Sequence, residues 1–201
     1  MRPWLPAMIA AALLASAPGS MVQAQAAAGS TPAQTLDNYT IQRLVLINDQ
    51  GQVLLEKNAV GWMTPALRST KRQSIREALQ GLIGDLGVTA GPPRLAGVFT
   101  YKFDETPPDP AHAAISFRTH YLARWTGGEV IQPKDPARTF QWVAISRAPA
   151  LIGMASLRTE TLQILEHPET LWGGSFLITF KGGKLVKTEV LEEPYALRPG
   201  D

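Results

Sequence analysis

The pattern of hydrophobic and polar positions begins with two strand-like segments joined by a turn. Residues 39–47 (YTIQRLVLI) and 52–57 (QVLLEK) are rich in large apolar and β-branched side chains. The four residues between them, 48–51, have the composition of a tight turn. This pattern predicts a β-hairpin at the start of the domain.

A change from strand to helix periodicity follows at residues 74–86. The apolar residues there recur at steps of three and four: Ile75, Ala78, Leu79, Leu82, Ile83 and Leu86. At about 100° per residue they fall within an arc of about 140°, which is the pattern of an amphipathic helix. Gly87 stands directly after the last of them and is expected to end the helix.

The rest of the chain has the pattern of further strands with one short helix. We expect strands at 97–101, 114–125, 140–145, 176–180 and 185–191, and a helix at 159–166. Residues 61–65 and the acidic, proline-rich loop 104–110 are expected to be irregular, and 126–129 and 181–184 to be turns. The last turn closes a C-terminal hairpin. Strands before and after a central helix predict a mixed α/β sandwich.

The N-terminus has the order of parts found in a secretory signal peptide. Arg2 precedes an uncharged, Ala- and Leu-rich run at 7–17, which is followed by a Pro-Gly break and small residues up to Ala26. We expect cleavage after Ala26, or else after Ala24, and a flexible leader at 27–38. The apolar run is too short to span a bilayer, which needs about 20 residues. The favoured location is therefore a bacterial periplasm or the medium, and the alternatives are a membrane anchor or a disordered Ala-rich tail.

Charge and cysteine content exclude several classes of function. The net charge is only +2, and the basic residues form no cluster, so an electrostatic nucleic-acid binder is not expected. Cysteine is absent, which excludes disulfide scaffolds, thiol catalysis, Cys-ligated zinc and anchoring through a lipidated cysteine. No later segment of the sequence is long and apolar enough to be a transmembrane helix. We expect neither nucleic acid nor, after leader cleavage, a membrane as partner.

The order of these elements resembles the Nudix hydrolase family. A hairpin is followed by Trp62-x-x-Pro65, by an amphipathic helix and by Gly87-Val88, which matches the end of the family's box. Residues 121–129 resemble the family's strand that runs into a Gly-Gly-Glu turn, and 140–143 resemble the strand before its last helix. The resemblance implies a Nudix-like α/β/α sandwich on a mixed β-sheet, with an extra C-terminal β-hairpin. The implied division is a signal peptide (1–26), a leader (27–38), a Nudix-like domain (39–167) and a hairpin extension with tail (168–201).

The resemblance also implies metal chemistry, for which this chain keeps few of the usual residues. Nudix hydrolases cleave nucleoside diphosphates linked to another moiety, with water and with Mg²⁺ or Mn²⁺ held by several glutamates. The box is G-x5-E-x7-R-E-U-x-E-E-x-G-U, where U is aliphatic. Counted back from Gly87, its last three glutamates fall on Gly81, Gly84 and Asp85; counted forward from Leu67, the earlier one falls on Gln73. Asp85 is therefore the candidate metal ligand.

A second alignment of the box is open, because Arg76-Glu77-Ala78 spells its Arg-Glu-aliphatic step. The following glutamate pair then falls on Gln80-Gly81 and the closing glycine is lost, so the first alignment is preferred. Glu77 and Asp85 lie about 12 Å apart along a helix axis and about 80° around it. One ion would not bind both carboxylates.

Gly81 and Gly84 interrupt the polar face of the expected helix. A glycine costs about 1 kcal/mol relative to alanine in a helix interior, so the pair weakens the helix. Either another segment or a ligand approaches the bare backbone there, or the residues drifted after catalysis was lost. The second explanation is favoured.

Other residue patterns give no clear catalytic site. His112, His120 and His167 are too dispersed for a zinc site, and His120 is expected to be a structural histidine. A G-x-S-x-G elbow of serine hydrolases is absent from the sequence. The acids Asp104, Glu105 and Asp109 are either displaced metal ligands or parts of a solvated loop. Five aromatic residues either stack on a base or pack in the core: Trp62, Phe99, Tyr101, Trp125 and Trp142.

Two hypotheses of function remain. In the first, the chain is an exported Nudix-like protein with a degenerate box, which binds a small molecule or a protein partner without catalysis. In the second, it is an active hydrolase of a nucleoside diphosphate linked to another moiety, with Mg²⁺ or Mn²⁺ held by Asp85 and loop carboxylates from 104–109. The export signal favours the first, because nucleotides are principally cytoplasmic. The sequence assigns no catalytic or ligand-binding residue.

Overall fold

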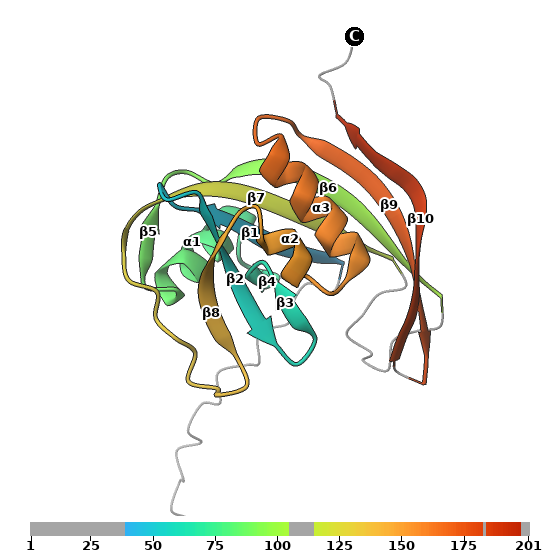
Figure 1. Cartoon of the computed structure of the whole chain (residues 1–201), viewed down its shortest axis with the longest axis horizontal. Helices are drawn as coiled ribbons and strands as arrows, with labels where there is room; N and C mark the ends of the chain where they lie inside the picture. Colours follow the sequence, from blue (N-terminus) through green and yellow to red (C-terminus); the bar gives the residue numbers. More distant parts are fainter. Residues whose placement is uncertain (1–38, 105–114, 183, 198–201) are drawn as a thin grey trace, which may run out of the picture. The chain divides into compact units, whose positions relative to one another are not determined.

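The computed structural model describes residues 39–104, 115–182 and 184–197, which form a mixed β-sheet with helices on both faces. The elements are β1 (Thr40–Ile47), β2 (Gln52–Asn58), β3 (Gly61–Met63), β4 (Ala66–Leu67), α1 (Ile75–Asp85), β5 (Val88–Ala90), β6 (Arg94–Asp104), β7 (Ile115–Gly128), β8 (Thr139–Ala144), α2 (Ala148–Leu151), α3 (Ala155–Glu166), β9 (Trp172–Lys181) and β10 (Lys184–Ala196). The sheet order is β10-β9-β6-β7-β1-β2-β3, with β4 beside β1, β5 beside β7 and β8 beside β2 (Figure 1). The β1–β7 and β6–β9 pairs are parallel and the other pairs are antiparallel.

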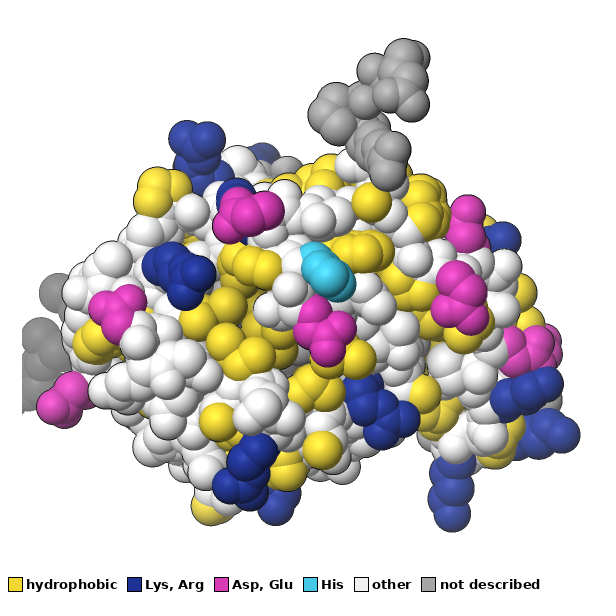
Figure 2. All heavy atoms as spheres, turned by 45° about the horizontal axis from the view of Figure 1, so that its top comes forward, with side chains coloured by type: hydrophobic (Ala, Val, Ile, Leu, Met, Phe, Trp, Pro, Cys, Tyr) yellow, Lys and Arg dark blue, Asp and Glu magenta, His cyan; other side chains and the backbone are white. Residues whose placement is uncertain are grey.

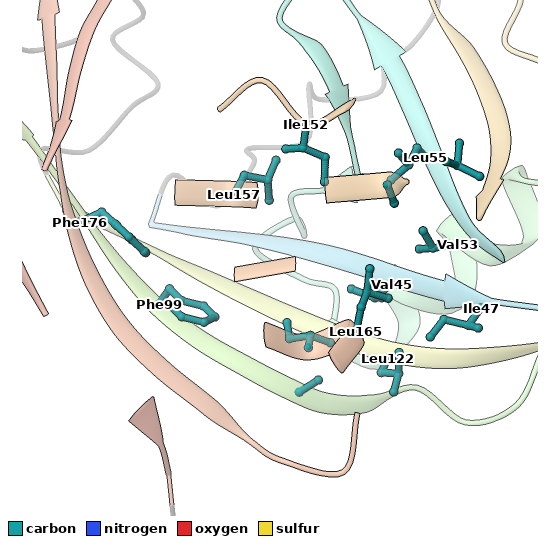
Figure 3. Packing of buried hydrophobic residues seen from close by; sticks show 14 of the residues in the cluster. Val45, Ile47, Val53, Leu55, Phe99, Leu122, Ile152, Leu157, Leu165 and Phe176 are labelled. Atoms are coloured by element: carbon teal, nitrogen blue, oxygen red, sulfur yellow. The ribbon is translucent and has the colours of Figure 1, made fainter. Parts of the chain in front are cut away.

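Opposite faces of β1 enter two separate hydrophobic clusters. Val45 and Ile47 pack with α2 and α3, as Figure 3 shows, whereas Leu44 and Leu46 pack against the end of α1 and β5. In Figure 1, α2 and α3 cross in front of the sheet and α1 lies behind it. The continuous apolar run in β1 therefore reflects a strand that is buried on both faces. The expected α/β/α sandwich on a mixed sheet is confirmed.

The helix expected at 74–86 is confirmed as α1, with clear signals at both of its ends. Ser74 is the N-cap residue, and with Glu77 it forms a capping box. Gly87 has a φ of +73°, the left-handed region that favours glycine. A Cβ at Gly87 would lie 2.5 Å from Ile131 Cγ1 and 2.7 Å from the Glu129 carbonyl oxygen, so glycine is required there.

The segment 61–65, expected to be irregular, contains a short strand. Asn58 pairs with Gly61, and Lys57 pairs with Trp62, so β3 completes a hairpin with β2. Two residues further on, β4 pairs with the middle of β1. Strands of two or three residues are too short to show a period of two, which is why the sequence pattern did not reveal them.

The prediction of a turn at 126–129 is wrong for residues 126–128, because β7 continues through Gly128. That end of β7 pairs with β5, a strand that the sequence analysis did not anticipate. Gly128 has a φ of +85°, and a Cβ there would lie 2.5 Å from the Gly87 carbonyl oxygen. The glycines that indicated a turn instead allow two backbones to approach closely.

The second helix begins earlier than expected, and α2 precedes it. The N-cap residue of α3, Met154, makes no side-chain hydrogen bond to the helix, so no capping signal marks this start in the sequence. The buried residues of α3 follow one helical stripe: Ser156, Leu157, Glu160, Thr161, Ile164 and Leu165. The part that the sequence analysis left out therefore includes residues that face the sheet.

The C-terminal hairpin is confirmed, and it is longer than expected. β9 lies parallel to β6 and contributes two residues to the cluster under α2 and α3, Phe176, which Figure 3 shows, and Ile178. β10 forms the outer edge of the sheet, and its side chains are mostly exposed. Both extra strands thus share the sheet of the preceding residues, and β9 also shares their core.

The signal peptide and leader, residues 1–38, lie outside the described residues, so their assignment remains a prediction. None of the helices in the described part is long and apolar enough to cross a membrane.

Candidate functional site

Glu77, on the polar face of α1, is engaged at the start of its own helix. The backbone N–H and the hydroxyl of Ser74 both donate to Glu77 Oε2, each at 2.8 Å. These two hydrogen bonds lower the pKa of the Glu77 carboxyl group, and the bond from the backbone N–H has the larger effect. The carboxylate that the second box alignment singles out therefore acts as a cap.

Gly81 and Gly84 leave the same face of α1 bare. A Cβ added at either position meets no described atom within 4 Å. No described segment approaches this backbone, so packing within the described residues does not explain the two glycines. Side chains would fit at both positions, and they would project into open space.

Asp85 lies in a groove of about 300 Å³ between α1 and residues 131–140. Lys134 and Arg138 also line this groove, and Asp85 is the one acidic residue among its lining residues. Arg138 is paired with Glu56, with Nη2 at 2.8 Å from Oε1. The charged groups that share the groove with Asp85 are thus cations.

The ligand set that the resemblance implies is not assembled in the described part of the chain. No three His, Cys, Asp or Glu side chains gather there as a metal site. Asp104 is exposed at the end of β6, and Glu105 and Asp109 lie outside the described residues. Mg²⁺ and Mn²⁺ need several oxygen ligands, so the described residues do not fit such an ion. Asp85 as a metal ligand remains a prediction.

A second polar group lies on the opposite face of the sheet, beneath α3. We call it the α3 polar cluster, and its side chains come from β1, β6, β7 and α3. Each member is at most 7% exposed: Arg43, Tyr101, Arg118, His120, Ser156 and Glu160. Burying this many polar groups is costly unless each finds a partner, so the cluster is a candidate functional site.

Short contacts connect most members of the α3 polar cluster. His120 Nε2 lies 2.8 Å from Glu160 Oε2, and the Tyr101 hydroxyl donates to Ser156 Oγ at 2.8 Å. The Arg118 guanidinium stacks on the Tyr101 ring, with Cζ at 4.7 Å from the ring centre. Arg43 Nη1 donates to the carbonyl oxygen of Thr64 at 3.2 Å.

Burial sets the protonation states in the α3 polar cluster. It lowers the pKa of His120, which keeps the imidazole neutral at neutral pH. Burial, and then the Glu160 carboxylate, raise the pKa of Tyr101 well above its ordinary value, so the phenol stays protonated. Burial, and then the charge of Arg43, lower the pKa of Arg118 to about 10. At this pKa Arg118 still carries its charge at neutral pH. Arg43 is treated as charged too, because an arginine guanidinium stays protonated in proteins at neutral pH.

Polar atoms of the α3 polar cluster remain without a partner within the described residues. They are Nε of Arg43, Nη1 of Arg118, Nδ1 of His120 and Oε1 of Glu160. Each is shielded from solvent, so each calls for a partner that the described residues do not supply.

The other sequence candidates are spread over the molecule. His120 is buried and bonded to Glu160, as expected of a structural histidine, although one ring nitrogen lacks a partner. His167 stacks on Trp172 at 5.7 Å, and His112 lies outside the described residues.

The five aromatic candidates do not line one base-binding pocket. Phe99 and Tyr101 are core residues, Trp125 packs edge-on against Trp142, and Trp62 packs at the border of the cluster under α3.

Sequence reasoning missed four residues of the α3 polar cluster: Arg43, Arg118, Ser156 and Glu160. Arg43 stands inside the apolar run of β1, and Arg118 alternates with His120 along β7 on the face turned towards α3. A charged residue inside a strand that is otherwise buried was the available signal. Glu160 is seen to face the sheet only when the whole of α3 is known, because the buried stripe of the helix begins at Ser156.

The sequence matches no family model and no curated protein. Solved structures share its fold. The Mutator MutT protein from Bacillus halodurans has 20% identity and a TM-score of 0.58, and the match covers 76% of this chain and 97% of that one. A NUDIX hydrolase from Nitrosomonas europaea has 14% identity and a TM-score of 0.51, with 72% and 80% covered. The chain therefore has the Nudix fold.

Proposed function

We propose that this Nudix-fold chain is an exported protein with a degenerate box that binds a small molecule or a protein partner without hydrolysing it. One observation supports this above the others. The face of α1 that would present the box glutamates has bare backbone at Gly81 and Gly84, and the nearby Glu77 carboxylate caps the helix. A hard dication held there would lack most of its oxygen ligands.

The similar structure from Nitrosomonas europaea is named a hydrolase, and the same fold supports many functions through the residues at its sites. Fold alone therefore does not transfer that activity to this chain. On the face drawn in Figure 2, acidic and basic side chains alternate with groups of hydrophobic side chains. Such a mixed surface is compatible with a small-molecule or protein ligand and offers little to a polyanion.

A titration of the chain with Mn²⁺, followed by NMR line broadening, tests the proposal. Paramagnetic Mn²⁺ broadens resonances near any bound ion, including weakly bound ones. We expect no selective broadening around Asp85. Selective broadening that disappears in Asp85→Asn would contradict the proposal and support the hydrolase with displaced loop ligands.

A gain-of-function variant provides the positive control. Gly81→Glu together with Gly84→Glu would place three carboxylates, with Asp85, at helical spacings of three and four residues. We expect this variant to show selective Mn²⁺ broadening, and the matched Gly81→Gln with Gly84→Gln variant to show none. Broadening in neither variant would mean that missing carboxylates are not what prevents metal binding.

Export is tested by the mass of the protein recovered from a bacterial host that secretes it. A mature chain that starts at Ala27, or at Gln25, is the expected result. An intact N-terminus on a cytoplasmic product would contradict this part of the proposal.

A further inference from the structure

The α3 polar cluster contains more positive than negative charge. Arg43 and Arg118 are both buried, and both interact with a single carboxylate of the cluster, Glu160. Glu56 also acts on Arg43, but it is paired with Arg138 at 2.8 Å. An uncompensated charge in the protein interior is expensive, so a site with two guanidinium groups and one shared carboxylate favours a further anion.

Unpartnered N–H groups occur on both of these arginines. Nε of Arg43 and Nη1 of Arg118 are shielded from solvent and donate to no described atom. A carboxylate or phosphate oxygen accepts such donors in charge-assisted hydrogen bonds. The chemistry of the orphaned atoms thus agrees with the sign of the excess charge.

The remaining contacts of the cluster hold the Arg118 guanidinium in place. Tyr101 stacks under the Arg118 guanidinium and is itself fixed by its hydrogen bond to Ser156. Arg43 and Arg118 keep 7% and 6% of their surface exposed, whereas His120 and Glu160 keep 0%. The His120–Glu160 pair is therefore the most deeply buried part of the cluster, and the two arginines retain a small exposed surface.

We propose that the α3 polar cluster binds a singly charged oxyanion group of a small molecule, a carboxylate or a phosphate diester, between Arg43 and Arg118. This inference deepens the binding function proposed above, because it assigns a ligand class to the non-catalytic protein. One negative charge balances the cluster, and a planar or tetrahedral oxyanion presents enough acceptors for both unpartnered N–H groups.

Thermal unfolding of the full chain in inorganic phosphate, acetate and chloride, at constant ionic strength, tests the site. An anion that binds the folded state raises Tm in a saturable way. We expect phosphate or acetate to do so, and Arg118→Met to weaken the apparent affinity at least tenfold. Arg94→Met is the matched control, because Arg94 is partly exposed and is not a member of the cluster; its Nη2 lies 3.8 Å from Glu169 Oε2. This variant should keep the wild-type rise of Tm.

A measurement on the wild-type chain keeps the inference falsifiable if Arg118→Met fails to fold. The side-chain Nε–H resonance of Arg43 should shift with phosphate or acetate and stay unchanged with chloride. No shift together with no rise in Tm would overturn the proposal and leave bound water as the partner of the orphaned atoms. An equal rise of Tm in wild type and Arg118→Met would overturn it as a non-specific salt effect.

An intramolecular carboxylate is the competing occupant, and it has its own experimental outcome. The sequence that follows β6 contains Glu105 and Asp109, which lie outside the described residues. A rise of Tm with phosphate or acetate that appears only in a Glu105→Gln, Asp109→Asn variant would show that the chain supplies its own anion. This result would overturn the proposal that the cluster binds a free ligand. The Mn²⁺ titration is independent of these arms, so failure of the anion site and failure of the non-hydrolytic function are distinguishable.

Discussion

The three glycines in and just after α1 have opposite effects on stability. Gly87 adopts a left-handed conformation and contacts Ile131 and the backbone of Glu129 too closely for a side chain. Gly81 and Gly84 have helical neighbours on both sides and open space around them. The first glycine is required by the fold, and the other two lower the stability of the helix.

Replacing Gly81 or Gly84 with alanine should stabilise the protein by about 1 kcal/mol each. The physical reason is the lower backbone entropy of the unfolded chain, with no steric cost in the folded one. Urea unfolding measures the change, and Gly87→Ala is the control, which should destabilise. A loss of stability in Gly81→Ala or Gly84→Ala would mean that something outside the described residues occupies this face.

His120 should make stability depend on pH below about 6.5, the ordinary histidine pKa. Burial lowers its pKa in the folded state, so between the two pKa values the unfolded chain binds a proton that the folded chain does not. Stability therefore rises with pH through this window and falls as the pH is lowered, by up to about 1.4 kcal/mol per pH unit.

Chemical denaturation between pH 5 and 8 measures this dependence. His120→Gln, which keeps a donor for Glu160, should lose this part of the slope, whereas the exposed His167→Gln should retain it. Identical slopes in wild type and His120→Gln would show that another group is responsible.

At the scale of elements, the sequence predicted helices and strands where periodicity and caps agree. The cap residue Ser74, the apolar stripe and Gly87 predict both ends and the buried face of α1. Such signals are absent from the start of α3, whose N-cap residue Met154 makes no capping hydrogen bond, and from the short strands β3, β4 and β5. Their formation depends on partners that are distant in sequence, as when Ala66 pairs with Arg43. The α3 polar cluster was missed for the same reason, because strand pairing and the first turn of α3 bring its members together.

The two strands of the C-terminal hairpin should contribute unequally to stability. A chain that ends at Leu171 loses the β6–β9 pairing and two core side chains, Phe176 and Ile178. Each such loss costs about 2–5 kcal/mol, against a total stability of about 5–15 kcal/mol, so we expect no cooperative unfolding. A chain that ends at Gly182 loses only the exposed β10 and should still unfold cooperatively at lower temperature. Calorimetry compares the two, and cooperative unfolding of the shorter chain would mark the hairpin as a dispensable addition.

At the scale of the whole molecule, the class of fold was accessible from sequence because the order of elements is itself informative. The hairpin, the helix that ends at Gly87, and the strand that runs into Gly127 and Gly128 occur in an order that resembles one family. The function was less accessible, because it depends on side chains that differ from the family at the box positions. Gly81 and Gly84 show which carboxylates are missing from α1, and nothing in the local sequence shows that Arg43 and Arg118 come together beneath α3.

The parallel pairings of the sheet also affect how the chain acquires its structure. Thr40 pairs with Phe117 in the middle of the sheet, and Gly97 pairs with Trp172 beside it. Neither pairing forms before most of the chain has been synthesised, and such non-local contacts slow folding relative to local ones. The edge of β1 that pairs with β7 therefore stays without its partner strand in the nascent chain until β7 is available. For a chain that we propose is exported, this delay prolongs the unfolded state in which a polypeptide can be threaded through a secretion channel.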